Sequence, residues 1–358
     1  MTHHSRRKFI VGLSASIAAP AIVRPAFATP TAPVVDVVAD FGADPTGSTS
    51  SDLAFQNFTA FVKTNGRQPG LGSGTLGCVG TIPNGTYVGL SSYDLTHSNG
   101  FLLQAPGNYG AVLYADGQTS GRHGPVFDMT GCNGSKIMGP VVYAMDQGGN
   151  PPAVLPSCAI LLAASSLGDD CNRNEIYGGG CAGFFSSACL AMVGATDNKI
   201  DFYSMIQQAA PGHGGIGYTP PSLMHSCNPD WYVSSPYTSI ISGNANCGEN
   251  TFNQVEVHSR NSAGGWAEYY RNAYSVRHFG GNASCGGGGN AIVLFQGDGN
   301  RSILCAGRQY WTESAPPPAY LFQTTDSPVS RLICEACDET GAWSSSRLNG
   351  SFPGFVWQ

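Results

Sequence analysis

Charged residues are scarce in this chain. Only 11% of its 358 residues are Asp, Glu, Lys or Arg, and the formal net charge is −6. A partner with a phosphate backbone requires a basic surface, so this balance argues against nucleic acid. Beyond the N-terminal segment, no stretch is long and apolar enough to indicate a membrane span. We therefore expect neither nucleic acid nor membrane as a partner of the mature protein.

The sequence also lacks the short motifs of several large enzyme classes. It contains no GxSxG, no HExxH, no P-loop and no dinucleotide fingerprint. Cys334-x-x-Cys337 is a lone pair without a second pair at zinc-ribbon spacing, so we assign it neither a metal nor a redox function. Any chemistry must therefore come from residues that are dispersed along the chain.

The N-terminus carries an export signal. Ser5-Arg6-Arg7-Lys8-Phe9-Ile10 matches the twin-arginine motif, and Ala26-Phe27-Ala28 forms a small-x-small cleavage site. Residues 1–28 are thus predicted to be a signal peptide, with an exported, periplasmic or extracellular product. Cleavage leaves 13 basic residues against 23 acidic ones, a formal charge near −10.

Twelve cysteines in an exported chain predict disulfides or buried thiols. Cys132, Cys158 and Cys181 lie 26 and 23 residues apart, and this spacing fits a ladder of cysteines or disulfides between neighbouring coils.

A repeated pattern organises the chain from about residue 71 onward. Short β-branched or aromatic runs alternate with Gly, Asn and Ser turns, and an Asn-x-apolar signature recurs at Asn174, Asn198 and Asn250, with a looser version at Asn300. The first interval is 24 residues, and the next two, 52 and 50, are close to twice that value. A constant period of this length is typical of a solenoid, in which each coil buries its face on its neighbours. We expect the asparagines to have a structural role at the turns, and the glycine-rich run 282–290 to be a loop.

The segment Val37–Val62 precedes this pattern and has a distinctive order. A β-branched run leads into Asp40-Phe41-Gly42-Ala43, a Pro45–Gly47 turn follows, and Asp52 stands where a helix N-cap is expected. Four apolar residues give that helix one buried stripe: Leu53, Phe55, Phe58 and Val62. This order resembles the entry segment of the pectate-lyase-like right-handed parallel β-helix superfamily.

The resemblance implies an all-β fold, a single-stranded right-handed parallel β-helix. Residues 29–70 would form an N-terminal strand and capping helix, and residues 71–358 the solenoid with loop excursions and a C-terminal cap. Members of the superfamily are mostly polysaccharide lyases, glycoside hydrolases, epimerases and phage depolymerases, so a polysaccharide is the implied substrate. The sequence departs from the family in two ways. Its one Asp-Asp pair, Asp169-Asp170, sits in a turn, and the aspartate clusters of calcium-dependent pectate lyases are absent. We predict no required cofactor; calcium has no recognisable site.

Candidate site residues concentrate between Glu256 and Glu313. Five of the ten arginines of the mature chain fall here, beside histidines and aromatic residues. Arginine forks match carboxylates, and aromatic faces suit sugar rings, so a chain containing uronic acids is the favoured ligand. The expected substrate-binding residues are Arg271, Arg308, Tyr177, Trp266, Tyr310 and Trp311.

Side-chain alternation predicts which residues share the outer surface. In residues 250–260, Phe252, Val255 and Val257 should face inward, with a shift in parity near Gln254. Glu256, His258 and Arg260 would then face outward. In residues 198–203, Ile200 and Phe202 should face inward, which places Lys199, Asp201 and Tyr203 outside, with Tyr177 in the same place one coil earlier.

Two reactions fit these residues, and β-elimination leads. In elimination, His258 or Arg260 would act as base, Tyr203 as acid, and Arg308 or Arg271 would bind the uronate carboxylate. In hydrolysis, Asp201 and Glu256 would form the carboxylate pair, with Glu268 and Glu313 in reserve. A glycosyl-transferring enzyme on the same scaffold, or a non-catalytic glycan-binding or surface solenoid, is the remaining alternative.

Overall fold

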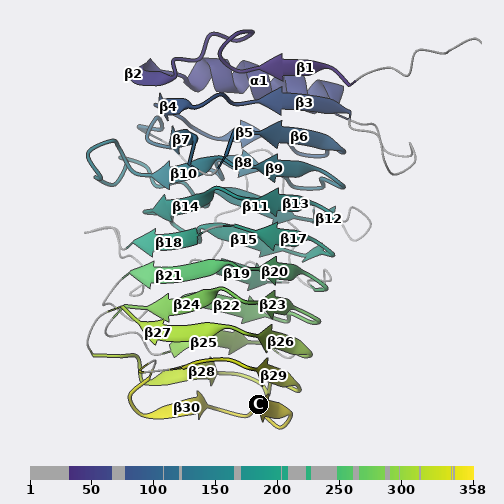
Figure 1. Ribbon diagram of the computed structural model, residues 1–358, viewed down its shortest axis with the longest axis vertical. Coiled ribbons are helices and arrows are strands. Elements are labelled where there is room, and N and C mark those ends of the chain that lie inside the picture. The colour runs from purple at the N-terminus through teal and green to yellow at the C-terminus, as the bar shows by residue number, and fades with distance from the viewer. Residues whose placement is uncertain are drawn as a thin grey trace, which may run out of the picture. The chain divides into compact units, whose positions relative to one another are not determined.

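The computed structural model describes residues 32–66, 77–107, 109–120, 123–164, 171–202, 204–208, 223–226, 248–260, 266–286, 291–297, 299–313, 316–339, 341 and 343–358. Residues Ala32–Gln358 form one compact unit. Within it, short strands stack in chain order along three parallel sheets (Figure 1). The fold is the expected right-handed parallel β-helix.

Each sheet takes one strand from each coil, and neighbouring strands are parallel. Sheet 1 contains β1 (Val34–Asp36), β3 (Cys78–Thr81), β6 (Phe101–Gln104), β9 (Lys136–Met138), β13 (Glu175–Tyr177), β17 (Lys199–Asp201), β20 (Thr251–Asn253), β23 (Arg277–Phe279), β26 (Ile303–Ala306), β29 (Leu332–Glu335) and β31 (Phe355–Trp357).

Sheet 2 contains β2 (Thr46–Ser50), β4 (Gly85–Val88), β7 (Ala111–Tyr114), β10 (Val141–Ala144), β14 (Gly180–Gly183), β18 (Ser204–Gln208), β21 (Glu256–Arg260), β24 (Asn282–Cys285) and β27 (Gln309–Thr312). Sheet 3 contains β5 (Tyr93–Asp94), β8 (Phe127–Asp128), β11 (Ile160–Ala163), β15 (Leu190–Val193), β19 (Leu223–Ser226), β22 (Glu268–Arg271), β25 (Ala291–Gln296), β28 (Tyr320–Thr324) and β30 (Ser346–Asn349). A short pair, β12 (Cys171–Asn172) with β16 (Ala195–Thr196), completes the described strands.

The corner between sheet 1 and sheet 2 explains the predicted shift in parity. Only two residues separate β20 from β21, and the first of them, Gln254, has a positive φ of 51°. This left-handed residue turns the chain without consuming a full strand repeat. Phe252, Val255 and Val257 consequently all face the core, as predicted, and each is at most 2% exposed.

The recurring asparagines form a hydrogen-bonded ladder between coils. The backbone N–H of Asn174 donates to Oδ1 of Asn198 at 2.9 Å, and that of Asn198 donates to Oδ1 of Asn250 at 2.9 Å. All three are fully buried. Asn300 is also buried but accepts instead from the backbone of Ala273 at 3.0 Å. The predicted structural role of these asparagines is confirmed, because they pair backbone groups where one coil turns into the next.

Helix α1 (Asp52–Asn65) packs against the first coil, and its details correct two expectations. The N-cap is Ser51, and Asp52 is the first helical residue. The Asp52 carboxylate accepts hydrogen bonds from Ser91 and Tyr93 of the adjacent coil, so it fastens the helix to the solenoid. Phe55, Phe58 and Val62 are buried in the core as predicted, whereas Leu53 is 69% exposed.

Two further predictions were wrong. Residues 282–290 were expected to be a loop, but Asn282–Cys285 form β24. Cys132, Cys158 and Cys181 form no ladder, because Cys132 follows β8, Cys158 precedes β11 and Cys181 lies in β14. Elsewhere, Cys305 of β26 and Cys334 of β29 are register partners on adjacent coils. All ten described cysteines are free thiols and nine are buried, so the alternative of buried thiols holds there. In the described part of the chain, no helix has the length and apolarity needed to cross a membrane.

Candidate functional site

The outer face of sheet 2 gathers the strongest group of titratable side chains. On β21, Val257 points into the core, so Glu256, His258 and Arg260 face outward, as the alternation predicted. The register aligns His258 with Ser284 of β24 and with Trp311 of β27. The strands β21, β24 and β27 are consecutive in sheet 2 (Figure 1). Three consecutive coils therefore present polar and aromatic side chains at one position of the same sheet.

His258, Ser284 and Glu313 are joined by short contacts. Nδ1 of His258 lies 2.6 Å from Oγ of Ser284 and 3.0 Å from Oε1 of Glu313. The Ser284 hydroxyl donates to the same Glu313 oxygen at 2.9 Å. Because the hydroxyl proton goes to the carboxylate, the serine oxygen accepts from the imidazole. This network assigns a proton to Nδ1 of His258.

Two charged side chains flank this triad. Nε of Arg260 donates to Oε2 of Glu313 at 3.1 Å, and the Arg260 side chain is 57% exposed. On the other side, Nε2 of His258 lies 3.5 Å from Oε2 of Glu256. The imidazole itself is nearly buried, 9% exposed, with the Trp311 ring edge-on at 5.7 Å. Trp311 is 40% exposed and offers an aromatic face beside the cluster.

The environment of Glu313 keeps its carboxyl ionised. Burial by itself would raise the pKa of Glu313, but hydrogen bonds from His258 and Ser284, with the charges of His258 and Arg260, hold that pKa below its ordinary value. An ionised Glu313 orients the imidazole through the Nδ1 proton, and in the neutral form of His258 the lone pair is then on Nε2. The arrangement can therefore supply a general base at Nε2, with a guanidinium close by.

Two predicted substrate-binding residues are in fact inside the solenoid. Arg308 is 0% exposed and forms a two-pronged pair with Glu268, with Nη1 to Oε2 at 3.0 Å. Tyr310 is 1% exposed and lies under the Arg308 guanidinium at 5.5 Å. The expectation that both reach a bound polysaccharide is wrong. Arg308 takes the corner position that Val255 holds two coils earlier, and this position points inward.

The same interior network removes Glu268 from the reserve carboxylates. Glu268 is 1% exposed, and its Oε2 accepts from the Tyr270 hydroxyl at 2.9 Å. That hydroxyl lies 2.6 Å from Nε2 of His278, whose ring stacks on Phe252 at 4.5 Å. We call Glu268, Arg308, Tyr270 and His278 the inner network, and His258, Ser284, Glu313 and Arg260 the outer cluster.

Other predicted site residues lie on other sheets. Arg271 belongs to β22 of sheet 3, and Trp266 packs beside the outer face of that sheet against a cluster that includes Tyr269. Tyr177 and Asp201 are register partners on sheet 1, where burial raises the pKa of Asp201. The residues that were predicted to share one face therefore lie on two different sheets, sheet 1 and sheet 2. Tyr203, the predicted acid, lies outside the described residues.

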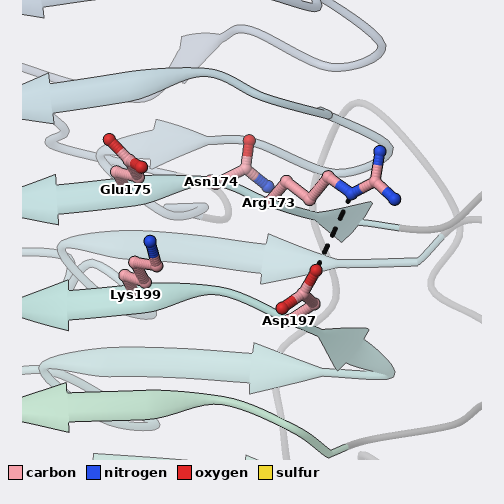
Figure 2. A pocket seen from close by; sticks show the side chains of 5 residues that line it. All are labelled: Arg173, Asn174, Glu175, Asp197 and Lys199. Atoms are coloured by element: carbon pink, nitrogen blue, oxygen red, sulfur yellow. Dashed lines mark ion pairs between the residues drawn. The ribbon is translucent and has the colours of Figure 1, made fainter. Parts of the chain in front are cut away.

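A pocket on sheet 1 is lined by Arg173, Asn174, Glu175, Asp197 and Lys199. Figure 2 shows the Arg173 and Asp197 side chains directed toward each other from adjacent coils, with Nε and Oδ2 3.7 Å apart. Both are largely exposed, and Glu175 pairs with Lys136 at 2.5 Å. These charged side chains neutralise one another on the surface, and we assign no functional site to this pocket. In the described residues, no group of three or more His, Cys, Asp or Glu side chains is placed to hold a metal ion.

Sequence reasoning missed Ser284 and ranked Glu313 only as a reserve. Ser284 fell in a stretch that was interpreted as a glycine-rich loop, although it lies one coil, 26 residues, after His258. Glu313 follows β27 and turns back over β24, where its backbone N–H donates to Cys285. Counting one coil onward from His258 would have found Ser284. The position of Glu313 depends on where β27 ends, because Glu313 is the residue directly after that strand.

The sequence matches no protein-family model and no curated protein. Several solved structures share the fold, among them the following three. PfbA, a surface adhesin of Streptococcus pneumoniae, is 14% identical, with a TM-score of 0.50 over 91% of this chain and 76% of its own. ORF18 of Geobacillus virus E2 is 11% identical, with a TM-score of 0.50 over 88% of this chain and 59% of its own. A 1,3-α-1,4-β-D-galactose-4-sulfate-3,6-anhydro-D-galactose-2-sulfate 4 galactohydrolase is 9% identical, with a TM-score of 0.51 over 89% of this chain and 90% of its own. At these identities, the similarity establishes the fold.

Proposed function

We propose that this protein is an exported enzyme that cleaves an acidic polysaccharide on the outer face of sheet 2, by β-elimination at the outer cluster. The observation that carries the proposal is the contact set around Nδ1 of His258, with Ser284 at 2.6 Å and Glu313 at 3.0 Å. It supports an imidazole whose Nε2 accepts a proton. Export rests on the twin-arginine motif of the sequence.

The steps follow from the outer cluster. The substrate carboxylate pairs with the exposed guanidinium of Arg260, and this charge stabilises the carbanion that forms next to that carboxylate. Nε2 of His258 removes the C5 proton, the C4–O4 bond breaks, and a C4=C5 double bond forms. The leaving oxygen takes a proton from solvent. Glu313 and Ser284 act as positioning residues, since they hold the Nδ1 proton.

Hydrolysis is the second candidate, because two carboxylates contact opposite nitrogens of one imidazole. Glu256 lies 3.5 Å from Nε2 and Glu313 lies 3.0 Å from Nδ1. The imidazole ring of His258 lies between the two carboxylates and keeps them apart. This arrangement is compatible with the roughly 6.5–9.5 Å between the carboxyl groups of inverting glycosidases. Elimination is favoured because Glu313 is already engaged by three donors and is not available as an acid.

The two reactions leave different products. We would incubate the mature protein with polygalacturonate, alginate and neutral glucans, with and without calcium, and record ultraviolet absorbance of unsaturated uronate together with new reducing ends. Elimination predicts both signals on an acidic polymer. Reducing ends without absorbance would overturn elimination in favour of hydrolysis. Binding without either signal would overturn both and leave a glycan-binding solenoid.

Variants locate the reaction. His258→Gln and Arg260→Ala should each lower the rate about a hundredfold or more, in the range of a lost general base or charge partner. The matched control is Arg331→Ala, an exposed arginine at the start of β29 in sheet 1. Equal loss in Arg260→Ala and Arg331→Ala would remove the outer cluster from the mechanism.

A further inference from the structure

A single outward column continues from the outer cluster toward the N-terminal coils. The register aligns His258 with Ile206 of β18, then Ala182 of β14, Tyr143 of β10 and Tyr114 of β7. Neighbouring strands in a sheet are about 4.8 Å apart, so Tyr143 lies roughly 14 Å and Tyr114 roughly 19 Å from His258 along the stack. The strands β7, β10, β14, β18 and β21 are consecutive in sheet 2 (Figure 1), and the register places all five residues on one face of it.

The two tyrosines form an aromatic pair. Their ring centroids are 5.4 Å apart with an interplanar angle of 48°, and both rings are half-buried. Their neighbours on the strands, Leu113, Val142 and Ala144, point into the core, so the tyrosines face outward. Burial raises the pKa of Tyr143, so its hydroxyl stays neutral. Two adjacent aromatic faces on successive coils are the kind of surface that accepts the C–H faces of sugar rings.

This end of the column differs from the outer cluster in that its outward side chains carry no charge. The outward residues of β7, β10 and β14, all within the described strands, include no charged side chain: they are Val112, Tyr114, Val141, Tyr143, Gly180 and Ala182. The first carboxylates that follow β7 and β10 in the chain are Asp116 and Asp146. Asp116 accepts a hydrogen bond from the backbone of Gly89, and Asp146 accepts one from the backbone of Asn150. An uncharged aromatic surface in line with a charged centre suits the sugar rings, and not the carboxylates, of a long polymer.

We propose that Tyr114 and Tyr143 form a remote sugar-binding subsite for the same polysaccharide chain that reaches the outer cluster. This inference rests on the proposed function and extends it. The polymer would run across the coils, parallel to the solenoid axis, with Ala182 and Ile206 between the two sites. The substrate class is therefore a long, largely unbranched glycan, and fragments too short to span roughly 14 Å would not use the tyrosines.

The test compares chain lengths in a protein that binds without cleaving. In the His258→Gln background, we would measure the affinity for polygalacturonate and alginate fragments of increasing length by calorimetry. Adding Tyr143→Ala should weaken binding of long fragments about fivefold to tenfold and leave short fragments unchanged. Tyr143→Phe keeps the ring and should retain the affinity. Tyr109→Ala, an exposed tyrosine before β7, is the matched control.

The outcomes separate this inference from the proposed function. If the wild type cleaves long polymers but Tyr143→Ala binds long fragments normally, the subsite is refuted and the catalytic proposal stands. Equal weakening for short and long fragments also overturns it, because a remote site cannot act on fragments that do not reach it. If the wild type neither binds nor cleaves any acidic polymer, the proposed function fails first. Thermal unfolding of Tyr143→Phe and Tyr143→Ala shows whether a lost affinity comes from lost folding.

Discussion

Two groups of polar side chains in neighbouring coils contain the same chemistry. The inner network joins a glutamate, an arginine, a histidine and a tyrosine hydroxyl, and the outer cluster joins a glutamate, an arginine, a histidine and a serine hydroxyl. They differ in exposure. Glu268 and Arg308 are at most 1% exposed, whereas Arg260 is 57% exposed and Glu313 is 15% exposed.

This difference in exposure determines what each group can do. In the inner network every charge is neutralised by a partner in the same core, because an unpaired buried charge is very costly. No polymer can reach it, so its role is structural. Arg260 of the outer cluster, and Trp311 beside it, contact both protein and solvent, which allows a ligand to complete their contacts. Residue type alone does not distinguish an accessible polar cluster from a structural ion pair; the direction of the side chain does.

The largest expected effect is the loss of one partner from the inner ion pair. Arg308→Met leaves the Glu268 carboxylate buried without its cation, and we expect a loss of roughly 3–5 kcal/mol in the free energy of unfolding. Equilibrium urea unfolding, followed by circular dichroism, measures it. The exposed counterpart, Arg260→Met, should cost no more than about 1 kcal/mol, since exposed pairs contribute little.

A double substitution sharpens this prediction. Replacing both partners, as in Glu268→Leu with Arg308→Met, removes the uncompensated charge and should recover much of the stability lost in Arg308→Met. The structural interpretation would fail if Arg308→Met and Arg260→Met were equally destabilising, or if the double variant lost the sum of the two single losses.

The second prediction concerns the outer cluster, where we expect a large loss of activity and a small loss of stability. Glu313→Gln keeps the shape of the side chain but removes the charge that orients His258, and we expect the cleavage rate to fall at least about tenfold to a hundredfold. The stability should change far less than in Arg308→Met. Initial rates on the acidic polymer and urea unfolding, measured on the same preparation, provide the comparison. A Glu313→Gln protein with full activity would exclude a positioning role for this carboxylate.

A smaller loss is expected from the asparagine ladder. Asn198→Ala leaves the backbone N–H of Asn174 without its acceptor inside the core, which should cost about 1–3 kcal/mol. The neighbouring Lys199 is exposed on the same strand region, and Lys199→Ala should lie within about 0.5 kcal/mol of the wild type. Urea unfolding of the two variants tests the ladder. Similar values for both would mean that water or another group replaces the Asn198 amide.

The fold was accessible from the sequence because its signals are local and repeated. The spacing of Asn174, Asn198 and Asn250 gave the coil period, and those residues are the ladder that the structure shows. The alternation that placed Glu256 and His258 outside also follows from neighbouring residues, once Gln254 is taken as a corner. Asp52 was misplaced by one residue because cap and first-turn positions attract the same residue types.

The site was only partly accessible, since it depends on register between coils of unequal length. Arg308 and Tyr310 were expected outside because arginine and aromatic residues suit a polysaccharide. The corner position of Arg308 before β27 points inward, and Tyr310 aligns with the buried Ala283 and Val257 of the preceding coils. Arg271 and Trp266 were grouped with His258 by sequence proximity, although each coil divides its residues among three sheets. A sequence cluster of 58 residues spans about two coils, and sequence proximity within it does not establish a shared face.

The smallest predicted effect is a difference in how the two groups respond to pH. Glu313 has a folded-state pKa below its ordinary value, so its contribution to stability is present above about pH 4.3, the unfolded value, and disappears as the pH falls through the lower folded value.

The pKa of Tyr270 is shifted in the opposite direction. Burial, and then the charge of Glu268, raise its pKa well above the ordinary value, so its contribution is complete below about pH 10 and falls as the pH rises further. Stability curves from pH 2 to about pH 11 for Glu313→Gln and Tyr270→Phe should therefore differ from the wild type in slope at opposite ends, the first on the acid side and the second on the alkaline side. Slopes altered at the same end would show that the outer glutamate and the inner tyrosine do not hold the protonation states on which the comparison depends.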